Sequence, residues 1–439
     1  MNKQHRHIES LIEFLDKSPV NFLAVRNIEE LLQAKDFKKL KMSDRWEIIP
    51  GGKYYTTQND SSIFAFIAPG NTPGRMHIIS AHSDSPTFRV KPNCEMLSDG
   101  RMLKLNTEVY GGPILYTWFD RPLSLAGRVI LRGEDGSPFN VETRMVKFDR
   151  PMMTIPHLAI HFNRAVNEGN PLSRQKDMLP VVGRLPESED YHGWLKRQVA
   201  SELNVDVDHI IDYDLSVYDT TGACVVGAFD DFVSSGRLDD LSMVHAAMTA
   251  MTEADEASED TLRIMAIFDN EETGSGTKQG AGSPILDYIA RRVYIAMGAD
   301  EEDYLRSVAD SFMISADNAH GVHPNYVEKQ DPTNHPVLGD GPVVKINANC
   351  KYMTDARSSA IFTEICRVGG VEPQYFVNHS DVIGGSTLGN ILTSQIPLNG
   401  VDMGAAVWAM HSARETASVA DHLSIIRAFT TFYNLRTTR

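Results

Sequence analysis

Hydrophobic positions follow two alternating patterns along much of the chain. Strands buried on both faces are indicated by short, largely apolar runs at 63–68, 77–81, 262–268 and 312–316. Amphipathic helices are indicated by apolar residues that recur every three or four positions at 240–252, 283–297 and 419–435. Strands and helices that alternate in this way predict an α/β fold, with a mixed sheet covered by helices on both faces.

The segment 92–219 has a different pattern. Short β-type runs dominate it, at 103–109, 115–118, 123–131 and 141–148. Asp135-Gly136 is typical of a hairpin between the last two runs, and one helix is indicated near 191–203. We therefore expect a β-rich domain of 92–219, inserted into an α/β domain made of 1–91 and 220–439.

Composition and charge narrow the class of protein. The 439 residues suffice for two domains, and 42% hydrophobic with 23% charged residues is ordinary for a globular chain. The formal net charge of −16 argues against partners such as nucleic acid or an anionic membrane, because both attract basic patches.

Cysteine usage and the N-terminal pattern point to the cytoplasm. The 4 cysteines are scattered without a CxxC pair, which fits a reducing compartment. Ile8, Leu11, Ile12 and Leu15 have the spacing of an amphipathic helix rather than a signal peptide. No run approaches the roughly 20 apolar residues that span a bilayer. We expect a soluble cytoplasmic protein.

Glu271 and Glu272 directly follow the run at 262–268, within Asp-Asn-Glu-Glu-Thr-Gly-Ser. Neighbouring carboxylates repel each other, so such a pair at a strand end can mark a functional site, although an isolated pair is more often part of a solvated loop. One carboxylate could hold a metal ion while the other takes a proton from water. This division of labour is typical of a hydrolytic metalloenzyme.

Further candidate groups lie at the ends of predicted elements. His82 and Asp84 follow the run at 77–81, where His82 could ligate a metal and Asp84 could support a ligand. Asp239 and Asp240 lead into a predicted helix. Asp239 could bridge two cations about 3.5–4 Å apart, whereas Asp240 could be merely the N-cap.

Asp317 follows the run at 312–316, and His411 follows an apolar run near the C-terminus. Each candidate alone could be a loop residue or a structural histidine. Together, two histidines and three carboxylates fall at the ends of predicted elements of one α/β unit, where such folds gather ligands: His82, Asp239, Glu272, Asp317 and His411. This set suits two divalent ions, with Zn²⁺ the first choice and Mn²⁺ or Co²⁺ as alternatives.

Six motifs occur in a characteristic order: Ala-His-Ser-Asp-Ser-Pro, Gly-Arg-Leu-Asp-Asp, Asp-Asn-Glu-Glu-Thr-Gly-Ser, His-Gly-Val-His-Pro-Asn-Tyr, Gly-Gly-Ser-Thr-Leu-Gly and Met-His-Ser. With them the chain resembles the aspartyl aminopeptidases, metallopeptidase family eighteen, nearly from end to end. The resemblance implies a phosphorylase/zinc-peptidase-like catalytic domain split by a β-rich dimerisation domain, and a homo-dodecamer.

The resemblance also implies how the metal ligands divide. His82, Asp239 and Asp317 would bind one ion. Asp239, Glu272 and His411 would bind the other.

Catalytic and substrate-binding roles follow from the same resemblance. Glu271 would be the general base, and Asp84 belongs with it to the catalytic set. The residues expected to bind substrate are His157, His320, His323, Lys345, Gly385 and Ser386. Among them His157 would reach a neighbour's active site, and Lys345 could attract an acidic side chain.

We therefore predict a dinuclear metal-dependent aminopeptidase that hydrolyses N-terminal residues, Asp or Glu, from peptides with a free N-terminus. Cys350-Lys351 departs from the glutamine-arginine expected in the family, which leaves the side-chain preference open. The alternatives are a broader or neutral-preferring aminopeptidase, a carboxypeptidase or deacylase of the same fold, and a non-catalytic assembly or cargo shell.

Overall fold

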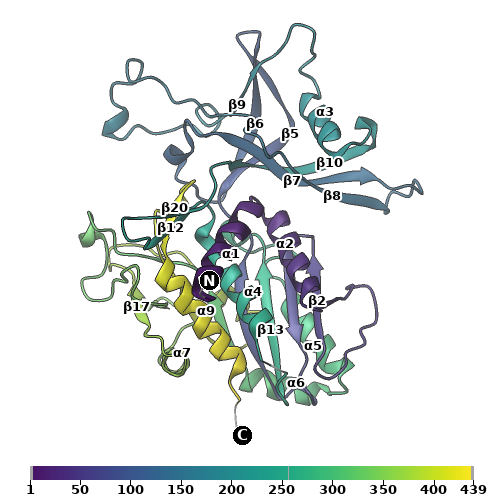
Figure 1. Ribbon diagram of the computed structural model, residues 1–439, viewed down its shortest axis with the longest axis vertical. Coiled ribbons are helices and arrows are strands. Elements are labelled where there is room, and N and C mark those ends of the chain that lie inside the picture. The colour runs from purple at the N-terminus through teal and green to yellow at the C-terminus, as the bar shows by residue number, and fades with distance from the viewer. Residues whose placement is uncertain (1–2, 256, 437–439) are drawn as a thin grey trace. The chain divides into compact units, whose positions relative to one another are not determined.

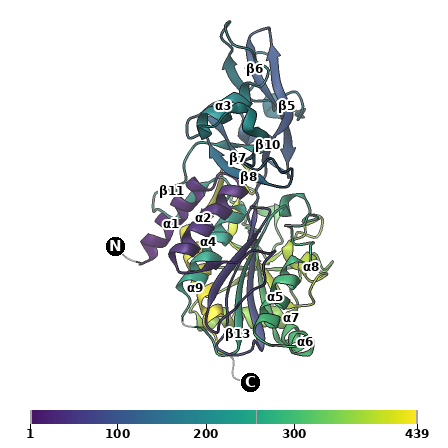
Figure 2. The ribbon, with the colours of Figure 1, turned by 90° about the vertical axis from the view of Figure 1, so that its right-hand side faces the viewer.

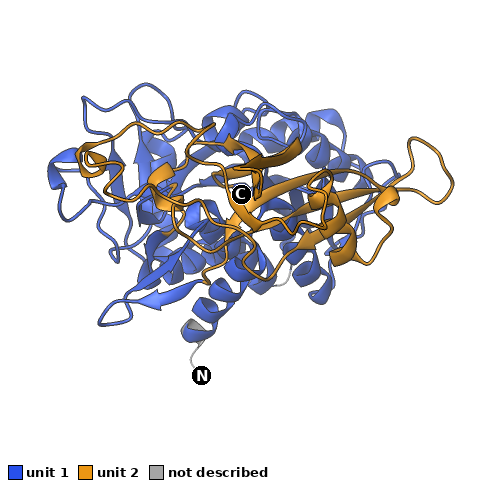
Figure 3. Ribbon diagram, turned by 90° about the horizontal axis from the view of Figure 1, so that it is seen from above, with its two compact units in different colours: residues 1–84, 223–410, 415–439 blue, residues 85–222, 411–414 orange. Residues whose placement is uncertain are grey.

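The computed structural model describes residues 3–255 and 257–436, which divide into two compact units. Unit 1 comprises 1–84, 223–410 and 415–439, and unit 2 comprises 85–222 and 411–414 (Figure 3). The predicted insertion, 92–219, falls within unit 2. None of the helices in the described residues combines the length and the apolar character that crossing a membrane requires.

Unit 1 is built on a mixed sheet that has nine strands in the described part of the chain. Their order across the sheet is β1 (Lys38–Lys39), β2 (Lys53–Gln58), β3 (Ser62–Ile67), β13 (Thr261–Phe268), β4 (Arg75–His82), β14 (Phe312–Ala316), β18 (Asn399–Gly404), β16 (Val343–Ile346) and β17 (Gln374–Val377). Strands β13, β4, β14 and β18 run parallel, whereas β3 and β16 pair antiparallel with this central group. The predicted strands are confirmed as β3, β4, β13 and β14, each buried along its whole length.

Helices cover both faces of this sheet. Side chains alternate along each strand, so one strand contributes to two hydrophobic cores. In β3, Ile63, Ala65 and Ile67 face one hydrophobic core, and Phe64 and Phe66 face another. The first core includes side chains of α1 (Lys3–Lys17), α2 (Asn21–Ala34), α4 (Leu238–Glu253), α7 (Ala356–Val368) and α9 (Val419–Asn434). The second includes side chains of α5 (Ile285–Ala296), α6 (Glu301–Asp310) and α8 (Leu388–Leu392). Figure 2 shows α1, α4 and α9 on one side of the sheet and α5 and α6 on the other, which confirms the predicted fold class.

A smaller sheet of unit 1 joins segments that are distant in sequence. Counted over the described residues, it has five strands, in the order β11 (Cys224–Val226), β12 (Phe232–Ser235), β20 (Glu415–Ser418), β19 (Ala406–Trp408) and β15 (Ala319–His320). Figure 1 shows β12 and β20 side by side, and they pair antiparallel. Their pairing brings the residues that precede α4 close to those that follow His411 in the chain.

Unit 2 is an antiparallel sheet with one α-helix, α3 (Trp194–Leu203), in the described residues. The strand order is β8 (Val141–Lys147), β7 (Leu123–Arg132), β10 (Ile210–Asp219), β5 (Thr87–Ser98), β6 (Met102–Tyr110) and β9 (Val181–Arg184). The predicted hairpin is confirmed, since β7 and β8 pair on either side of Asp135-Gly136. The expectation of a β-type run at 115–118 is wrong. Leu115–Trp118 forms a 3-10 turn, which buries Trp118 edge-on against Phe88.

Candidate metal centre

The candidate ligands of unit 1 gather at the carboxyl ends of three parallel strands. His82 ends β4, Asp317 directly follows β14, and Glu271 and Glu272 lie just beyond β13. The register places Phe268 of β13 opposite His82, so these strand ends are level. Loops at the carboxyl ends of parallel strands are where α/β folds place their ligands.

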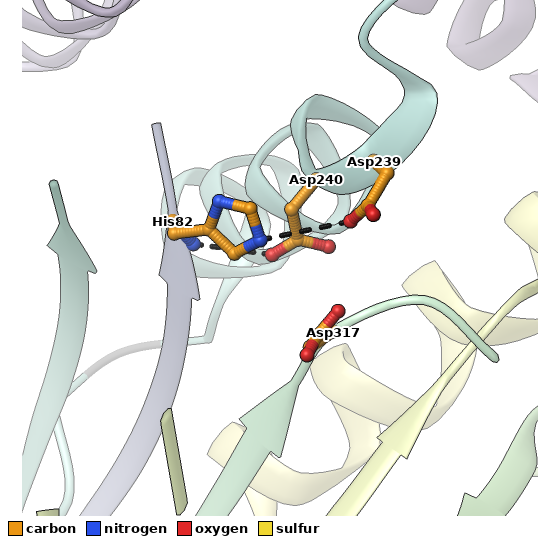
Figure 4. Close-up of side chains that lie close together, drawn as sticks. All are labelled: His82, Asp239, Asp240 and Asp317. Atoms are coloured by element: carbon orange, nitrogen blue, oxygen red, sulfur yellow. Dashed lines mark hydrogen bonds and ion pairs between the residues drawn. The ribbon is translucent and has the colours of Figure 1, made fainter. Parts of the chain in front are cut away.

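Four side chains form the first cluster, in which one ligand atom from each lies within 4.8 Å of the others: His82, Asp239, Asp240 and Asp317. All four are buried, and Figure 4 shows them converging from β4, the start of α4 and the end of β14. Nε2 of His82 lies 3.6 Å from Oδ1 of Asp239. Nδ1 of the same ring lies 3.0 Å from the backbone oxygen of Asp84. A ring held through Nδ1 in this way presents Nε2 to a metal.

The first turn of α4, which carries both aspartates, is irregular. Arg237 has a positive φ of 62°, Asp239 and Asp240 depart from helical dihedrals, and the peptide bond between them is cis. The side chain of Asp240 does not act as the N-cap that was its alternative role, because it is directed to the end of β4. Instead, Oδ2 of Asp240 accepts the backbone N–H of His82 at 3.1 Å.

Glu271 and Glu272 form a second cluster with His82, again with ligand atoms within 4.8 Å of one another. They lie on a 3-10 turn, η4 (Glu271–Thr273), that follows β13. Asp84 holds this turn, because its Oδ1 accepts the N–H of Glu271 and its Oδ2 accepts the N–H of Glu272, both at 3.1 Å. The structure thus gives Asp84 a contact with the backbone of both residues of the pair.

Charges in the cluster are crowded. Burial, with smaller contributions from Asp317, Asp84 and Asp239, raises the pKa of Glu271 to about 8. Burial and the neighbouring Asp239 raise the pKa of Glu272 well above its ordinary value. Burial opposes a charge on His82, but the carboxylates around its ring outweigh it and raise the pKa well above the usual range. Buried carboxylates repel one another unless a cation joins them.

The residues present fit a divalent metal. Their donors are imidazole nitrogen and carboxylate oxygen, the ligands that zinc and harder divalent ions take. Oδ1 of Asp240 is buried and accepts no hydrogen bond within the described part of the protein. A cation among these groups would offset both the burial and the mutual repulsion that raise the pKa values of Glu271 and Glu272.

His411 belongs to unit 2 by its contacts, although Met410 before it and Glu415 after it belong to unit 1. It has a positive φ of 70°. Its Nδ1 lies 3.1 Å from the backbone oxygen of Gly112. An imidazole that donates from Nδ1 carries its lone pair on Nε2, as a metal ligand must. Its role as the fifth ligand stays a prediction.

Lys345 of β16 is buried, and its ammonium group has close neighbours. Nζ lies 3.4 Å from Oδ2 of Asp317 and donates to the backbone oxygen of Asn318 at 3.1 Å. It also lies 5.4 Å from the centre of the Tyr352 ring. Burial disfavours the charge, but Asp317, Tyr352, Asp402 and Asp239 together outweigh it and raise the pKa, so Lys345 is positively charged.

The other predicted substrate residues of unit 1 are largely exposed. His320 ends β15, with its ring 5.9 Å from that of Phe376, and His323 lies 5.1 Å from the ring of Tyr326. Gly385 and Ser386 lie in the exposed loop before α8. Their binding roles stay predictions.

His157 lies in unit 2, and its surroundings orient the ring. Its N–H donates to Oδ1 of Asp120 at 3.0 Å, and the ring packs edge-on against Phe119 at 4.4 Å. Its predicted reach into a neighbouring active site stays a prediction.

Sequence reasoning missed one buried group beside the cluster. Oε2 of Glu415 accepts the backbone N–H of Asp239 at 3.0 Å. The available signal was an acidic residue four positions after His411, at the start of a short β-type run. That signal is too common to have singled out Glu415.

Comparisons with known proteins place this geometry in context. The model of a family described as "Aminopeptidase I zinc metalloprotease (M18)" matches residues 14–433. A probable M18 family aminopeptidase 2 from Clostridium acetobutylicum is 45% identical over 437 residues, which cover 99% of this chain and 100% of the relative.

Solved structures share the fold of this chain. The chain superposes on a structure of the Ape4 and Nbr1 complex with a TM-score of 0.94 at 33% identity, covering 98% of this chain and 86% of the other. For the mApe1 dodecamer of S. cerevisiae the TM-score is 0.85 at 27% identity, with 99% and 97% covered. These matches extend over both units.

Proposed function

The chain belongs to the M18 family of zinc metalloproteases, as its motifs predicted, and is a metalloaminopeptidase; from this premise we propose a dinuclear enzyme that removes N-terminal Asp and Glu from peptides. The observation that carries the proposal is the convergence of His82, Asp239, Asp317 and Glu272 at one sheet edge, with Glu271 beside them. With His411 they would supply the imidazole and carboxylate donors that two divalent ions require.

In this proposal His82, Asp239 and Asp317 hold one ion, and Asp239, Glu272 and His411 hold the other. Bound divalent ions polarise a scissile carbonyl and make water a stronger nucleophile at neutral pH.

Glu271 accepts the proton of the attacking water and passes it to the leaving amine. Asp84 keeps Glu271 and Glu272 in place through the two backbone N–H groups that it accepts. The turn therefore does not have to rearrange when the proton moves.

An enzymatic assay tests the reaction. We expect metal-stripped protein to cleave chromogenic amides of Asp and Glu only after Zn²⁺, Mn²⁺ or Co²⁺ is added. Acetylation of the substrate amino group should abolish cleavage, which separates an aminopeptidase from a carboxypeptidase or deacylase. Metal-independent cleavage, or equal cleavage of the acetylated substrate, would contradict the proposal.

A broader or neutral preference is the alternative, and one observation favours it. The ammonium group of Lys345 already contacts Asp317 and the backbone of Asn318. The same assay with Leu, Lys and Arg amides decides between the two. Faster cleavage of Leu than of Asp would leave the mechanism intact and remove the acidic preference.

We further propose that 92–219 is a dimerisation domain and that the protein assembles into a homo-dodecamer in the cytoplasm. The solved relative from S. cerevisiae is described as a dodecamer. The cysteines Cys94, Cys224, Cys350 and Cys366 are free thiols, in keeping with a reducing compartment. In such an assembly His157 of the partner subunit would complete the substrate site. A mass in solution near twelve times 48.8 kDa supports this, and a monomeric mass contradicts it.

A further inference from the structure

We propose that Glu415 is a positioning residue that fixes Asp239 for metal binding, an inference that rests on the proposed function. Glu415 is 1% exposed, and its Oε2 accepts the backbone N–H of Asp239 at 3.0 Å. Asp239 is the residue proposed to bridge the two ions. A shift of its backbone would therefore disturb both metal sites together.

The backbone of Asp239 needs such a partner. It lies in the first turn of α4, where backbone N–H groups have no acceptor within the helix. Its φ and ψ of −83° and 106° are not helical. A buried N–H left without an acceptor is costly, so the acceptor determines which backbone conformation is stable. A carboxylate is a strong acceptor, and it also suits the positive end of a helix.

Strand pairing places the carboxylate of Glu415 at this point. Glu415 is the first residue of β20, and it pairs with Ser235, the last residue of β12. Beyond Ser235 the chain turns into α4, and Asp239 lies four residues further on. Glu415 also stands four residues after His411 in the sequence. Glu415 therefore connects the segment that carries Asp239 with the segment that follows His411 in the sequence.

The contact depends on reach as well as on charge, and substitutions separate these properties. Glu415→Gln keeps an oxygen at the same distance from the backbone but removes the charge. Glu415→Asp keeps the charge but is one methylene shorter. Glu415→Ala removes both. If holding the N–H of Asp239 is what matters, Gln should substitute for Glu415 better than Asp does.

Asp421 provides a matched control. It is a buried carboxylate of unit 1 that accepts the backbone N–H groups of Gly339 and Gly341, at 2.8 Å and 2.7 Å. Asp421→Asn should lower the thermal midpoint without changing metal affinity, because its contacts hold a loop that carries none of the proposed ligands.

The experiment measures the affinity of the full-length, metal-stripped protein for Zn²⁺ and Co²⁺ against a competing chelator, together with the Co²⁺ absorption spectrum. We expect Glu415→Gln to bind within about threefold of wild type with an unchanged spectrum. Glu415→Asp and Glu415→Ala should bind about 10- to 100-fold more weakly with an altered spectrum, the usual range for a lost partner of a metal ligand.

Wild-type affinity in folded Glu415→Asp and Glu415→Ala, or a loss in Glu415→Gln as large as in Glu415→Ala, would overturn the inference. If Glu415→Ala does not fold, the order of Gln and Asp decides, and tighter binding by Asp overturns it. Wild-type protein that binds neither metal would instead overturn the proposed function, so the two failures are distinguishable.

Discussion

At the scale of single residues, the site depends on two adjacent glutamates for which we propose different tasks. Both lie on η4, and Asp84 accepts both of their backbone N–H groups. One carboxylate therefore holds the backbone of both glutamates. Different tasks for such neighbours mean that conservative substitutions of the two should have different effects.

Glu271→Gln should lower kcat by about 10²–10⁴-fold, the usual range for a lost general base. Metal content should be unchanged, because Glu271 is not among the proposed ligands. Steady-state kinetics with metal analysis checks this, and Glu364→Gln, at an exposed position of α7, is the control. Near-normal turnover would remove Glu271 from its role, and loss of metal would mean that the roles of Glu271 and Glu272 are exchanged.

Lys345 is the residue whose role decides between an acidic and a neutral substrate preference. Its contact with Asp317 means that Lys345→Met should weaken catalysis for every substrate. If it also attracts the substrate's carboxylate, kcat/KM for an Asp amide should fall at least about tenfold more than for a Leu amide, the value of a charge-assisted hydrogen bond. Equal losses would assign Lys345 to Asp317 alone.

At the scale of elements, the turn η4 is held to the end of β4 by Asp84. An asparagine at this position has only one oxygen acceptor, so one of the two N–H groups would lose its partner. Asp84→Asn should therefore lower kcat about 10- to 100-fold while the protein stays folded. Circular dichroism establishes folding, and unchanged kcat would show that the turn does not need this contact.

The elements that the sequence predicts best are those whose pattern is set by burial alone. Strands β3, β4, β13 and β14 are buried on both faces, so their apolar runs are continuous. Strand β5 was not predicted. It contains Pro92, which normally argues against a strand, and a change of register between Val90 and Glu95 accommodates it.

The candidate site could be predicted only in part, for a related reason. His82, Glu272 and Asp317 follow recognisable strands, so their convergence could be expected. Asp240 was open to reading as an N-cap because the irregular start of α4 has no sequence signature. The contact of Glu415 depends on the pairing of β12 with β20, which are about 180 residues apart in the sequence. The local pattern of hydrophobic and polar residues does not reveal which distant strands pair.

At the scale of the whole molecule, three buried histidines make unit 1 sensitive to acid. Burial lowers the pKa of His77 to about 4 and that of His422 to about 3, and it lowers the pKa of His245 well below the ordinary value. In the unfolded chain these rings titrate near 6.5. Below that pH the unfolded state binds more protons than the folded state, so the free energy of unfolding falls as pH falls from about 6.5 to 4.

Asp421 has the opposite effect on the free energy of unfolding, because burial raises its pKa to about 6 and its protonation below that pH favours the folded state.

One variant, His77→Gln, isolates the contribution of His77 to the loss of stability in acid. His77→Gln should lose less stability than wild type when the pH is lowered from 7 to 5, by about 2 kcal/mol. Denaturant unfolding at both pH values measures this difference. Parallel losses in the two proteins would show that His77 is not neutral in the folded state.

We propose above all that each chain holds two metal ions that the peptidase reaction requires. The most direct test is titration of metal-stripped protein with Zn²⁺, with bound metal and Asp-amide cleavage followed in the same samples. We predict that activity rises with metal and reaches its maximum near two ions per chain. Full activity in the metal-free protein, or a maximum at one ion with no second ion bound, would contradict the account.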